Sequence, residues 1–317
     1  MDLFSLSNTT LSPIAKEQFD LEKDIQKLVE ENLGLLFGLE FVSTEFALGA
    51  FRLDSLAFDQ QANAFVIIEY KKGTSYSVID QGYSYLSLML NNKADFILEF
   101  NEKMEGNLKK DQIDWSSSKV IFVSPSFNNY QKNSVNFKDV PFELWEIKKF
   151  EGDLIALEQH QSKSTQSINS LAGAASDSVI SQVSAEVKST TEEELVAKLS
   201  PKLQSIWQTL REKLEDYSDT FFYTTRAYVG WRKGGKTVAF LNLRKNTIVI
   251  EILRGNRSAE GEDSKNFFYL DDPEKMAEEL LWNWKSSRTG HKYRIKLKES
   301  EEIDYVLFLV NQKYESM

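Results

Sequence analysis

Apolar residues in the first part of the chain recur at helical spacing. One stripe consists of Leu21, Ile25, Leu28, Val29 and Leu33. A period of three to four residues is typical of an amphipathic helix, which we predict from about residue 19 to residue 36. The residues before it, 1–17, show no such period, and we expect them to form a loose leader.

Shorter apolar runs follow, and they are rich in aromatic and β-branched residues, which favour strands. Their boundaries predict strands over 40–46, 51–58 and 65–71, a helix over 75–90, and strands over 95–100, 119–124 and 141–149. Gly49 and the polar stretch 59–63 mark turns between the first three strands. This order of elements predicts an α/β domain over residues 1–158.

The composition changes after Leu157. Residues 159–190 consist largely of glutamine, serine, alanine and lysine, with few large apolar side chains. Such a segment buries too little surface to offset the entropy lost on ordering. We therefore predict a serine-, alanine- and glutamine-rich linker there.

A second domain is predicted over residues 191–317, with an α+β fold and an antiparallel sheet. Its first helix is expected to run from an acidic cap at 190–194 to about Tyr217, with a break near Pro201. The remaining elements are strands over 225–232, 237–243 and 247–253 with hairpin turns at Gly234-Gly235 and Lys245-Asn246, a helix from Asp272-Pro273 through Trp284, a strand over 293–297 and a helix over 303–314.

The amino-acid composition limits the kinds of catalytic and metal site that the chain can form. The 317 residues are 41% hydrophobic and 27% charged, which is an ordinary globular balance. The chain has no cysteine and only two histidines, His160 and His291. Disulfides, thiolate metal sites and cysteine nucleophiles are excluded, and a multi-histidine metal site or a serine–histidine triad is disfavoured. A bound metal would have to be held by carboxylates, which favours Mg²⁺ or Mn²⁺.

The cysteine content and the hydrophobic segments indicate the cellular compartment. A chain without cysteines fits a reducing cytosol. No segment has the pattern of a signal peptide or the length of a bilayer-spanning helix. We therefore expect a cytoplasmic protein with no membrane partner.

Acidic and basic side chains gather at the ends of two neighbouring predicted strands. Asp54 lies in the apolar run that begins at Phe51, and Glu69 and Lys71 close the next run. Because side chains alternate between the faces of a strand, Glu69 and Lys71 point to one face and Lys72 points to the other. Two carboxylates beside one ammonium suit a divalent cation and a water that attacks a phosphodiester.

Two further candidates lie on the helix that follows. Gln81 and Tyr85 are four residues apart and share one helical face. In the order Glu22, Asp54, Glu69, Lys71, Gln81 and Tyr85, the set resembles the PD-(D/E)xK nuclease superfamily. Gln81-Gly-Tyr-Ser-Tyr85 is similar to the Q-x-x-x-Y motif of its RecB-like branch, and residues 22–32 are similar to relatives of the archaeal mismatch endonucleases. The resemblance covers about residues 18–125 and implies a restriction-endonuclease-like αβββαβ core.

The resemblance and the chemistry together imply a metal site. Asp54 and Glu69 would hold Mg²⁺ or Mn²⁺, with the carbonyl of Tyr70 as a further ligand. Lys71 would orient or deprotonate the attacking water and stabilise the charge that builds on the phosphate.

The roles of the other candidates are open. Glu22 would bind a second metal or position a water, and the alternative is an exposed helical acid. Gln81 and Tyr85 would orient Lys71 or contact the phosphate backbone, and the alternative for Tyr85 is a core aromatic. Glu30 is expected on a solvated helix face.

The second domain contains a basic cluster. Between residues 224 and 257 there are eight lysines or arginines and one acidic residue, in a chain with a net charge of −10. The candidates for nucleic-acid contact are Arg226, Trp231, Arg232, Lys233, Lys236, Arg244 and Lys245. Basic residues beside aromatic ones suit a phosphate backbone and its bases, but cations on exposed strand edges also prevent aggregation. The region is similar to DUF5655, a bacterial domain of unknown function found in proteins labelled "predicted transport protein".

The sequence thus predicts a metal-dependent endonuclease that acts on nucleic acid, in particular DNA. Repair, restriction and defence are all compatible with these residues, and so is a homodimer. Two alternatives stay open. The nuclease-like fold could be a non-catalytic scaffold that binds nucleic acid, which the acidic net charge favours. Alternatively, the second domain could sense a small ligand and regulate the first.

Overall fold

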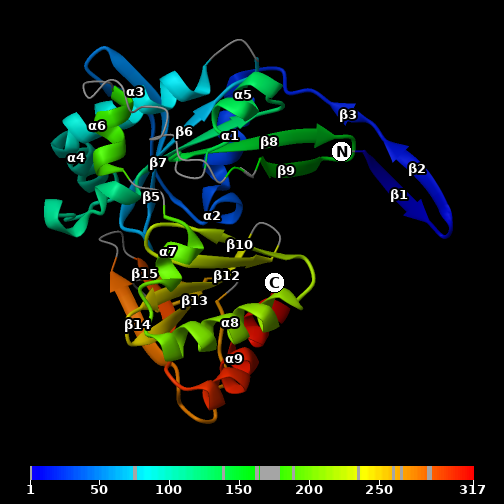
Figure 1. Ribbon diagram of the computed structural model, residues 1–317. Helices are drawn as coiled ribbons and strands as arrows, with labels where there is room; N and C mark the ends of the chain where they lie inside the picture. The colour runs from blue at the N-terminus through cyan, green and yellow to red at the C-terminus, as the bar shows by residue number, and fades with distance from the viewer. Residues whose placement is uncertain are drawn as a thin grey trace.

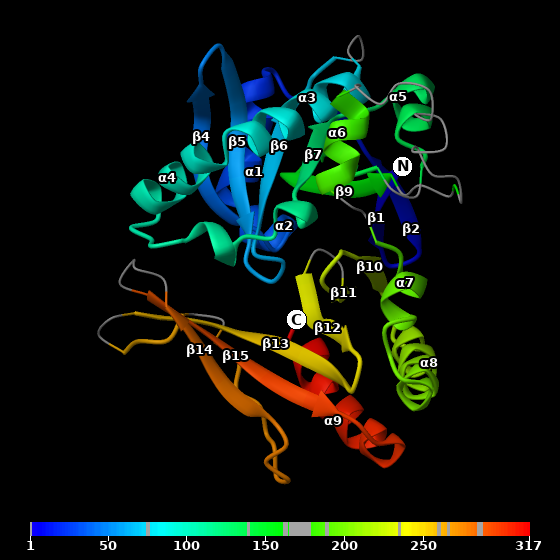
Figure 2. The same ribbon diagram turned by 60° about the vertical axis from the view of Figure 1, so that its left-hand side comes forward.

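The computed structural model describes residues 2–73, 77–137, 140–160, 164, 179–187, 190–233, 236–258, 261–264, 267–283 and 288–317. Within these residues the chain forms a seven-stranded sheet and a six-stranded sheet, each packed against helices, and a separate two-stranded hairpin (Figures 1 and 2). The observed class is mixed α and β, as predicted. No helix among the described residues is long and apolar enough to cross a bilayer.

The first sheet mixes antiparallel and parallel strands. Its order is β3-β8-β7-β6-β5-β4, and β9 also pairs with β8. The strands are β3 (Lys16–Glu17), β4 (Glu40–Leu48), β5 (Phe51–Asp59), β6 (Ala64–Tyr70), β7 (Lys119–Ser124), β8 (Phe142–Phe150) and β9 (Leu154–His160). The β4–β5–β6 meander is antiparallel, whereas β7 runs parallel to both β6 and β8. Every residue of β6 is buried, which is the pattern of a strand covered on both faces.

Helices cover both faces of this sheet. On one face lie α1 (Glu22–Glu31) and α2 (Leu33–Leu36), and on the other lie α3 (Val78–Asn91), α4 (Lys93–Lys103) and α6 (Val179–Glu186). Along β6, Ile68 and Tyr70 pack with α1, while Phe65 and Ile67 pack with α3 and α4. This alternation decides which side chains can reach the candidate site. The short helices η1 (Lys110–Gln112), η2 (Trp115–Ser117) and α5 (Asn129–Ser134) flank β7.

Three predictions for the first half of the chain differ from the structure. Residues 1–17 are not loose but contain β1 (Leu3–Ser7), β2 (Thr10–Ile14) and β3. The helix predicted over 19–36 is interrupted at Asn32, between α1 and α2. The strand predicted over 95–100 is part of helix α4. Phe96 and Phe100, one helical turn apart, are buried while Leu98 is exposed, so the apolar period there is helical.

The second sheet is antiparallel throughout, as predicted. Its order is β10-β11-β12-β13-β15-β14. The strands are β10 (Thr220–Thr224), β11 (Val229–Lys233), β12 (Lys236–Arg244), β13 (Thr247–Ser258), β14 (Glu278–Asn283) and β15 (Arg288–Leu297). The helices α7 (Glu192–Val196), α8 (Pro201–Glu215) and α9 (Ile303–Glu315), preceded by η4 (Ser300–Glu302), share one hydrophobic core with this sheet. The predicted break near Pro201 separates α7 from α8.

Three predictions for the second half also need correction. The helix predicted over 272–284 is absent: residues 272–277 form a turn and irregular backbone, and residues 278–283 form strand β14, which pairs with β15 at the sheet edge. Trp284 lies outside the described residues. The strand predicted over 225–232 begins only at Val229, because residues 225–228 form a turn in which Thr225 N donates to Tyr228 O. Within the predicted linker, residues 179–186 form α6, and Val183 packs into the first core. The predicted Gly234-Gly235 turn lies outside the described residues.

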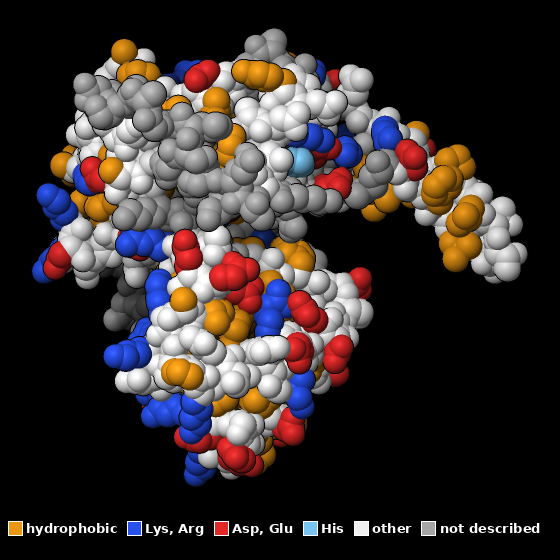
Figure 3. Space-filling model, in the orientation of Figure 1, with side chains coloured by type: hydrophobic (Ala, Val, Ile, Leu, Met, Phe, Trp, Pro, Cys, Tyr) orange, Lys and Arg blue, Asp and Glu red, His pale blue; other side chains and the backbone are white. Residues whose placement is uncertain are grey.

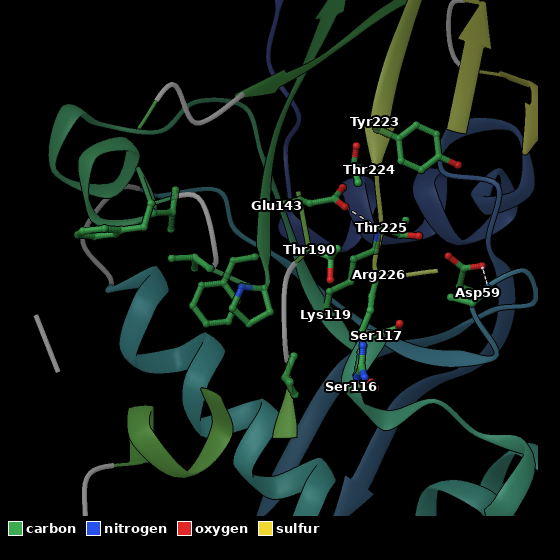
Figure 4. Close-up of a pocket in the computed structure, with 18 of the residues that line it drawn as sticks. Asp59, Ser116, Ser117, Lys119, Glu143, Thr190, Tyr223, Thr224, Thr225 and Arg226 are labelled. Atoms are coloured by element: carbon green, nitrogen blue, oxygen red, sulfur yellow. Dashed lines mark hydrogen bonds and ion pairs between the residues drawn. The ribbon is translucent and has the colours of Figure 1, made fainter. Parts of the chain in front are cut away.

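The two sheets meet at one end of the first sheet. The Tyr228 hydroxyl donates to Asp59 Oδ2 at 3.0 Å, and Arg232 Nη2 donates to the carbonyl of Leu36 at 2.7 Å. A cavity of about 410 Å³ lies beside this junction, lined from the first sheet by Lys119 and Glu143 and from the second by Tyr223 (Figure 4). Asp54, Glu69 and Lys71 are not among its lining residues.

Glu40, at the start of β4, makes stability depend on pH. Burial raises the pKa of its carboxyl from 4.5 to about 8. Between those values the folded state holds a proton that the unfolded chain has lost, so stability falls as pH rises across this window. We expect Glu40→Gln, which cannot ionise, to gain melting temperature relative to the native protein between about pH 5 and pH 8. A melting-temperature difference that stays constant with pH would contradict this assignment.

Candidate active site

Asp54 and Glu69, two of the three acidic residues predicted from the sequence, meet on the α3 face of the first sheet. Asp54 lies near the start of β5 and Glu69 near the end of β6. Lys71 follows β6 directly, and its backbone N–H donates to the carbonyl of Val123 at 2.9 Å, so the strand geometry continues through it. This explains why Glu69 and Lys71 share a face, as their spacing predicted.

Hydrogen bonds connect Glu69 directly to two other candidate residues and, through one of them, to a third. Lys71 Nζ lies 2.6 Å from Glu69 Oε1 and forms an ion pair with it. Gln81 Nε2 donates to the same oxygen at 2.7 Å and to the Tyr85 hydroxyl at 2.9 Å. Helix α3 presents Gln81 and Tyr85 one turn apart, and Ser77 caps its first turn by accepting from the backbone of Asp80. The structure thus brings Glu69, Lys71, Gln81 and Tyr85 into one connected group.

Asp54 joins this group through the backbone. Its Oδ2 accepts a hydrogen bond from Tyr70 N at 3.0 Å. Burial, reinforced by other carboxylates, raises the pKa of Asp54. Burial and then the Asp54 charge raise the pKa of Glu69 to about 7, against the opposing effect of Lys71. Burial alone would lower the pKa of Lys71. The Glu69 and Asp54 carboxylates have a larger combined effect, so the pKa of Lys71 is raised.

The donor set fits a hard divalent cation. Glu69 is 2% exposed, and its Oε2 is buried with no hydrogen-bond partner among the described residues. A buried carboxylate oxygen in this state is costly unless something compensates it. Asp54 and Glu69, with the carbonyl of Tyr70, could supply oxygen ligands of the kind that Mg²⁺ and Mn²⁺ prefer. Within the described ranges, no three acidic or histidine side chains lie close enough to form a metal site by themselves.

Glu22 lies at the margin of this group, and its charge contributes to the raised pKa values of Asp54 and Lys71. It begins α1, is exposed, and its Oε2 accepts a hydrogen bond from the backbone N–H of Lys72 at 2.9 Å. It therefore ties the start of α1 to the segment that carries Lys71. Lys72 itself points to the α1 side, where its Nζ donates to the carbonyl of Asp20.

A buried polar network behind the site was not predicted. Gln26 Nε2 donates to the carbonyl of Asp54 at 2.9 Å and to Glu30 Oε1 at 3.0 Å. Ser55 Oγ donates to Glu30 Oε1 at 2.5 Å and also lies within hydrogen-bond distance of the Tyr70 hydroxyl, at 3.1 Å. Glu30 is thus not on a solvated face, as we had expected. The spacing of Glu22, Gln26 and Glu30, four residues apart beside the apolar stripe of α1, is the sequence signal for this network.

Replacing Gln26 by leucine should destabilise the fold. The substitution removes the donor to the Asp54 carbonyl and leaves buried acceptors without a partner, which costs about 1–3 kcal/mol. Urea unfolding of Gln26→Leu beside the native protein measures the loss. Gln26→Glu, which keeps the size but replaces the amide donor by a carboxylate beside Glu30, should lose at least as much. A Gln26→Leu variant with unchanged stability would show that the network contributes nothing.

The candidates for nucleic-acid contact in the second sheet differ in exposure and in their partners. Trp231 and Arg232 are buried, and the Lys233 ammonium donates to the carbonyls of Tyr314 and Met317. Arg226 lies 3.6 Å from Asp114. Lys236, Arg244 and Lys245 are exposed. The buried side chains belong to the core and to the junction between the sheets, so they cannot contact a nucleic acid without rearrangement.

The second sheet lies far from the candidate site. Asp54 and the end of β6 mark one end of the first sheet, whereas Asp59, Ala62 and Ala64 at the other end contact Tyr228 of the second sheet. The five residues from Asp54 to Asp59 span about 17 Å of strand. Both views place the second sheet below the end of the first one (Figures 1 and 2).

Comparison with known proteins gives a clear relationship to one bacterial protein. No protein-family model matches the chain. A solved EndoMS–dsDNA2 complex matches 41% of this chain and 47% of its own with 18% identity, but its TM-score of 0.26 does not establish a common fold. An "Uncharacterized protein" of Haemophilus influenzae is 37% identical over 318 residues, which cover 98% of this chain and 99% of that protein. The chain therefore belongs to the same family as this Haemophilus influenzae protein.

Proposed function

We propose that this protein is a metal-dependent phosphodiester hydrolase of the PD-(D/E)xK type, with DNA as its substrate. The observation that carries the proposal is the group formed by Asp54, Glu69, Lys71, Gln81 and Tyr85. These residues come from two strands and one helix, and they converge at the end of a buried sheet. A cluster of buried ionisable groups with shifted pKa values at one edge of a fold is a feature of functional sites.

The residues have distinct roles in this proposal. Asp54 and Glu69, with the Tyr70 carbonyl, would hold Mg²⁺ or Mn²⁺, and such an ion polarises a phosphoryl oxygen and lowers the pKa of bound water. The Lys71 ammonium, next to Glu69, can donate hydrogen bonds to a phosphate oxygen and stabilise the charge that builds there. Gln81 orients Glu69 and Tyr85 through its two hydrogen bonds.

Residues 1–158 would form the nuclease-like domain and residues 191–317 a second domain. Nucleic-acid contact by the second domain is proposed only for its exposed cations, Lys236, Arg244 and Lys245. Because its sheet docks at the far end of the first sheet, these cations would contact a substrate well away from the scissile phosphate. A non-catalytic scaffold that binds nucleic acid is the second candidate function, and the net charge of −10 favours it.

A cleavage assay tests the proposal. Labelled single- and double-stranded DNA and RNA are incubated with the native protein in Mg²⁺, Mn²⁺ or EDTA. The same assay is run on Glu69→Gln, and Mn²⁺ binding is measured by calorimetry for both proteins. We expect cleavage of DNA in Mg²⁺ or Mn²⁺, none in EDTA, and loss of both cleavage and Mn²⁺ binding in Glu69→Gln.

The other outcomes are equally informative. No cleavage of any substrate and no Mn²⁺ binding by a folded native protein would overturn the enzyme and leave the scaffold. Cleavage that survives in EDTA would overturn the metal site. Cleavage of RNA alone would overturn the choice of DNA but keep the hydrolase.

A further inference from the structure

The hairpin formed by β1 and β2, which we call the arm, extends away from the rest of the molecule (Figure 1). Its strands pair antiparallel, with Leu6 opposite Leu11 and Phe4 opposite Pro13. Directly opposed residues share a face. Phe4, Leu6, Leu11 and Pro13 therefore form one continuous apolar face, and near the tip the other face carries serine and threonine.

The apolar face of the arm is open to solvent. Phe4 is 54% exposed, Leu6 68% and Leu11 62%. Hydrophobic side chains are visible along the arm in the space-filling view (Figure 3). An isolated two-stranded hairpin is at best marginally stable in water, and a contiguous exposed apolar patch marks an interaction site. The amphipathic pattern of the arm therefore indicates a partner that covers this face.

The composition of the arm restricts the partner. Residues 3–14 contain no lysine, arginine, aspartate or glutamate, although 27% of the whole chain is charged. Binding of a nucleic-acid backbone depends on cations, which the arm lacks. An uncharged apolar surface instead requires an apolar protein surface.

Exposed apolar side chains also lie next to the base of the arm. The carbonyl of Ala15 accepts a hydrogen bond from Glu151 N at 2.9 Å, which fixes the arm beside the turn that leads into β9. Leu154 and Ile155 open β9 and are both exposed. Among the described strands β9 pairs only with β8, so it is an edge strand. Exposed edge strands are common sites of pairing with another chain.

We propose that the arm docks on the start of β9 of a second copy of this chain, and that the second copy returns its own arm in the same way. The arm and the start of β9 lie side by side in one chain. A two-fold axis near the base of the arm would therefore place each arm on the β9 strand of the other copy. The proposal does not depend on the hydrolase function.

The surface area that two docked arms would bury favours a dimer in which each copy docks its arm on the other. The three large exposed side chains of one arm offer roughly 300 Å² of apolar surface. A single arm with its receiving surface would bury roughly 600 Å², which is typical of crystal-packing contacts, whereas two arms would bury roughly 1,200 Å², the lower end of specific interfaces. Buried area does not fix affinity, so the dimer is to be sought at high protein concentration.

Cysteine cross-linking tests the docking directly, because the chain has no cysteine of its own. A Leu6→Cys chain is mixed with a Leu154→Cys or an Ile155→Cys chain and oxidised. We expect a disulfide-linked species of twice the 36.5 kDa chain mass. It should form with only one of the two β9 variants, because neighbouring strand residues face opposite ways. Leu6→Cys mixed with Leu98→Cys, an exposed site on α4, gives the background.

Light scattering at high protein concentration, about 100 μM, supplies the second measurement. The native protein should have the mass of a dimer, and the Leu6→Ser, Leu11→Ser double variant should be a monomer. Leu98→Ser, the matched control, should stay dimeric. A monomeric native protein, a dimer that survives in the double variant, or a Leu6→Cys chain that links only to itself would overturn the proposal.

Discussion

Replacing Lys71 by methionine is expected to lower metal-dependent cleavage about 10²–10³-fold, the usual effect of removing one donor that stabilises transition-state charge. Methionine keeps the length and much of the packing of lysine but cannot neutralise charge. Lys71 pairs with Glu69 and is not itself a proposed metal ligand. Mn²⁺ binding by Lys71→Met should therefore persist. Single-turnover cleavage rates and Mn²⁺ calorimetry on the same preparation separate the two effects.

Lys103→Met is the matched control, since Lys103 lies exposed at the last turn of α4. It should cleave at the native rate. A Lys71→Met variant that keeps native cleavage would show that the ammonium has no part in the chemistry. A variant that loses Mn²⁺ binding as well would show that Lys71 acts only by holding Glu69 in place.

Short-range rules placed Glu69, Lys71, Gln81 and Tyr85 in one group, but they assigned Gln81 to Lys71, whereas Gln81 is hydrogen-bonded to Glu69. The alternation of a strand places Glu69 and Lys71 on one face, and the helical repeat places Gln81 one turn from Tyr85. Both rules concern residues within one element. Only one long-range assumption was needed, that the helix after β6 packs on the face that carries Glu69. The hydrogen bond from Gln81 to Glu69 shows this packing.

The errors arise where the environment of a residue depends on distant parts of the chain. Glu30 looked like a surface acid because its partner, Ser55, is 25 residues away on β5. Arg232 looked like a free cation because the sequence does not reveal that it reaches the carbonyl of Leu36 across the sheet junction. Pro273 is a good helix start, but residues 278–283 pair with β15 as a strand, and this tertiary context outweighs local propensity.

The arm shows a different limit. Residues 3–14 alternate apolar and polar positions only weakly, and they carry few residues that could build a core of their own. Their sequence pattern therefore does not predict an element that is buried within the chain. The alternation becomes meaningful once the register pairs Leu6 with Leu11, because both then lie on one uncovered face.

Substituting Gly230 by alanine is expected to destabilise the protein by about 3 kcal/mol, at the upper end of the usual cost of overpacking. Gly230 of β11 lies directly opposite Tyr223 of β10. A β-carbon at position 230 would fall onto the Tyr223 ring, well inside van der Waals contact. The ring would have to leave its place beside Tyr228, whose hydroxyl donates to Asp59. Urea unfolding of Gly230→Ala measures the cost.

A double-mutant cycle shows whether the Tyr223 ring is the cause. In a Tyr223→Ala background the space over position 230 is free, so Gly230→Ala should then cost no more than about 0.5 kcal/mol. Gly73→Ala is the matched control, because a β-carbon there would meet nothing within 4 Å. If Gly230→Ala costs the same with and without Tyr223, its effect lies in the backbone of β11. If the cost disappears, the close approach of Tyr223 to a residue without a side chain is what fixes β10 against β11 at the junction of the two sheets.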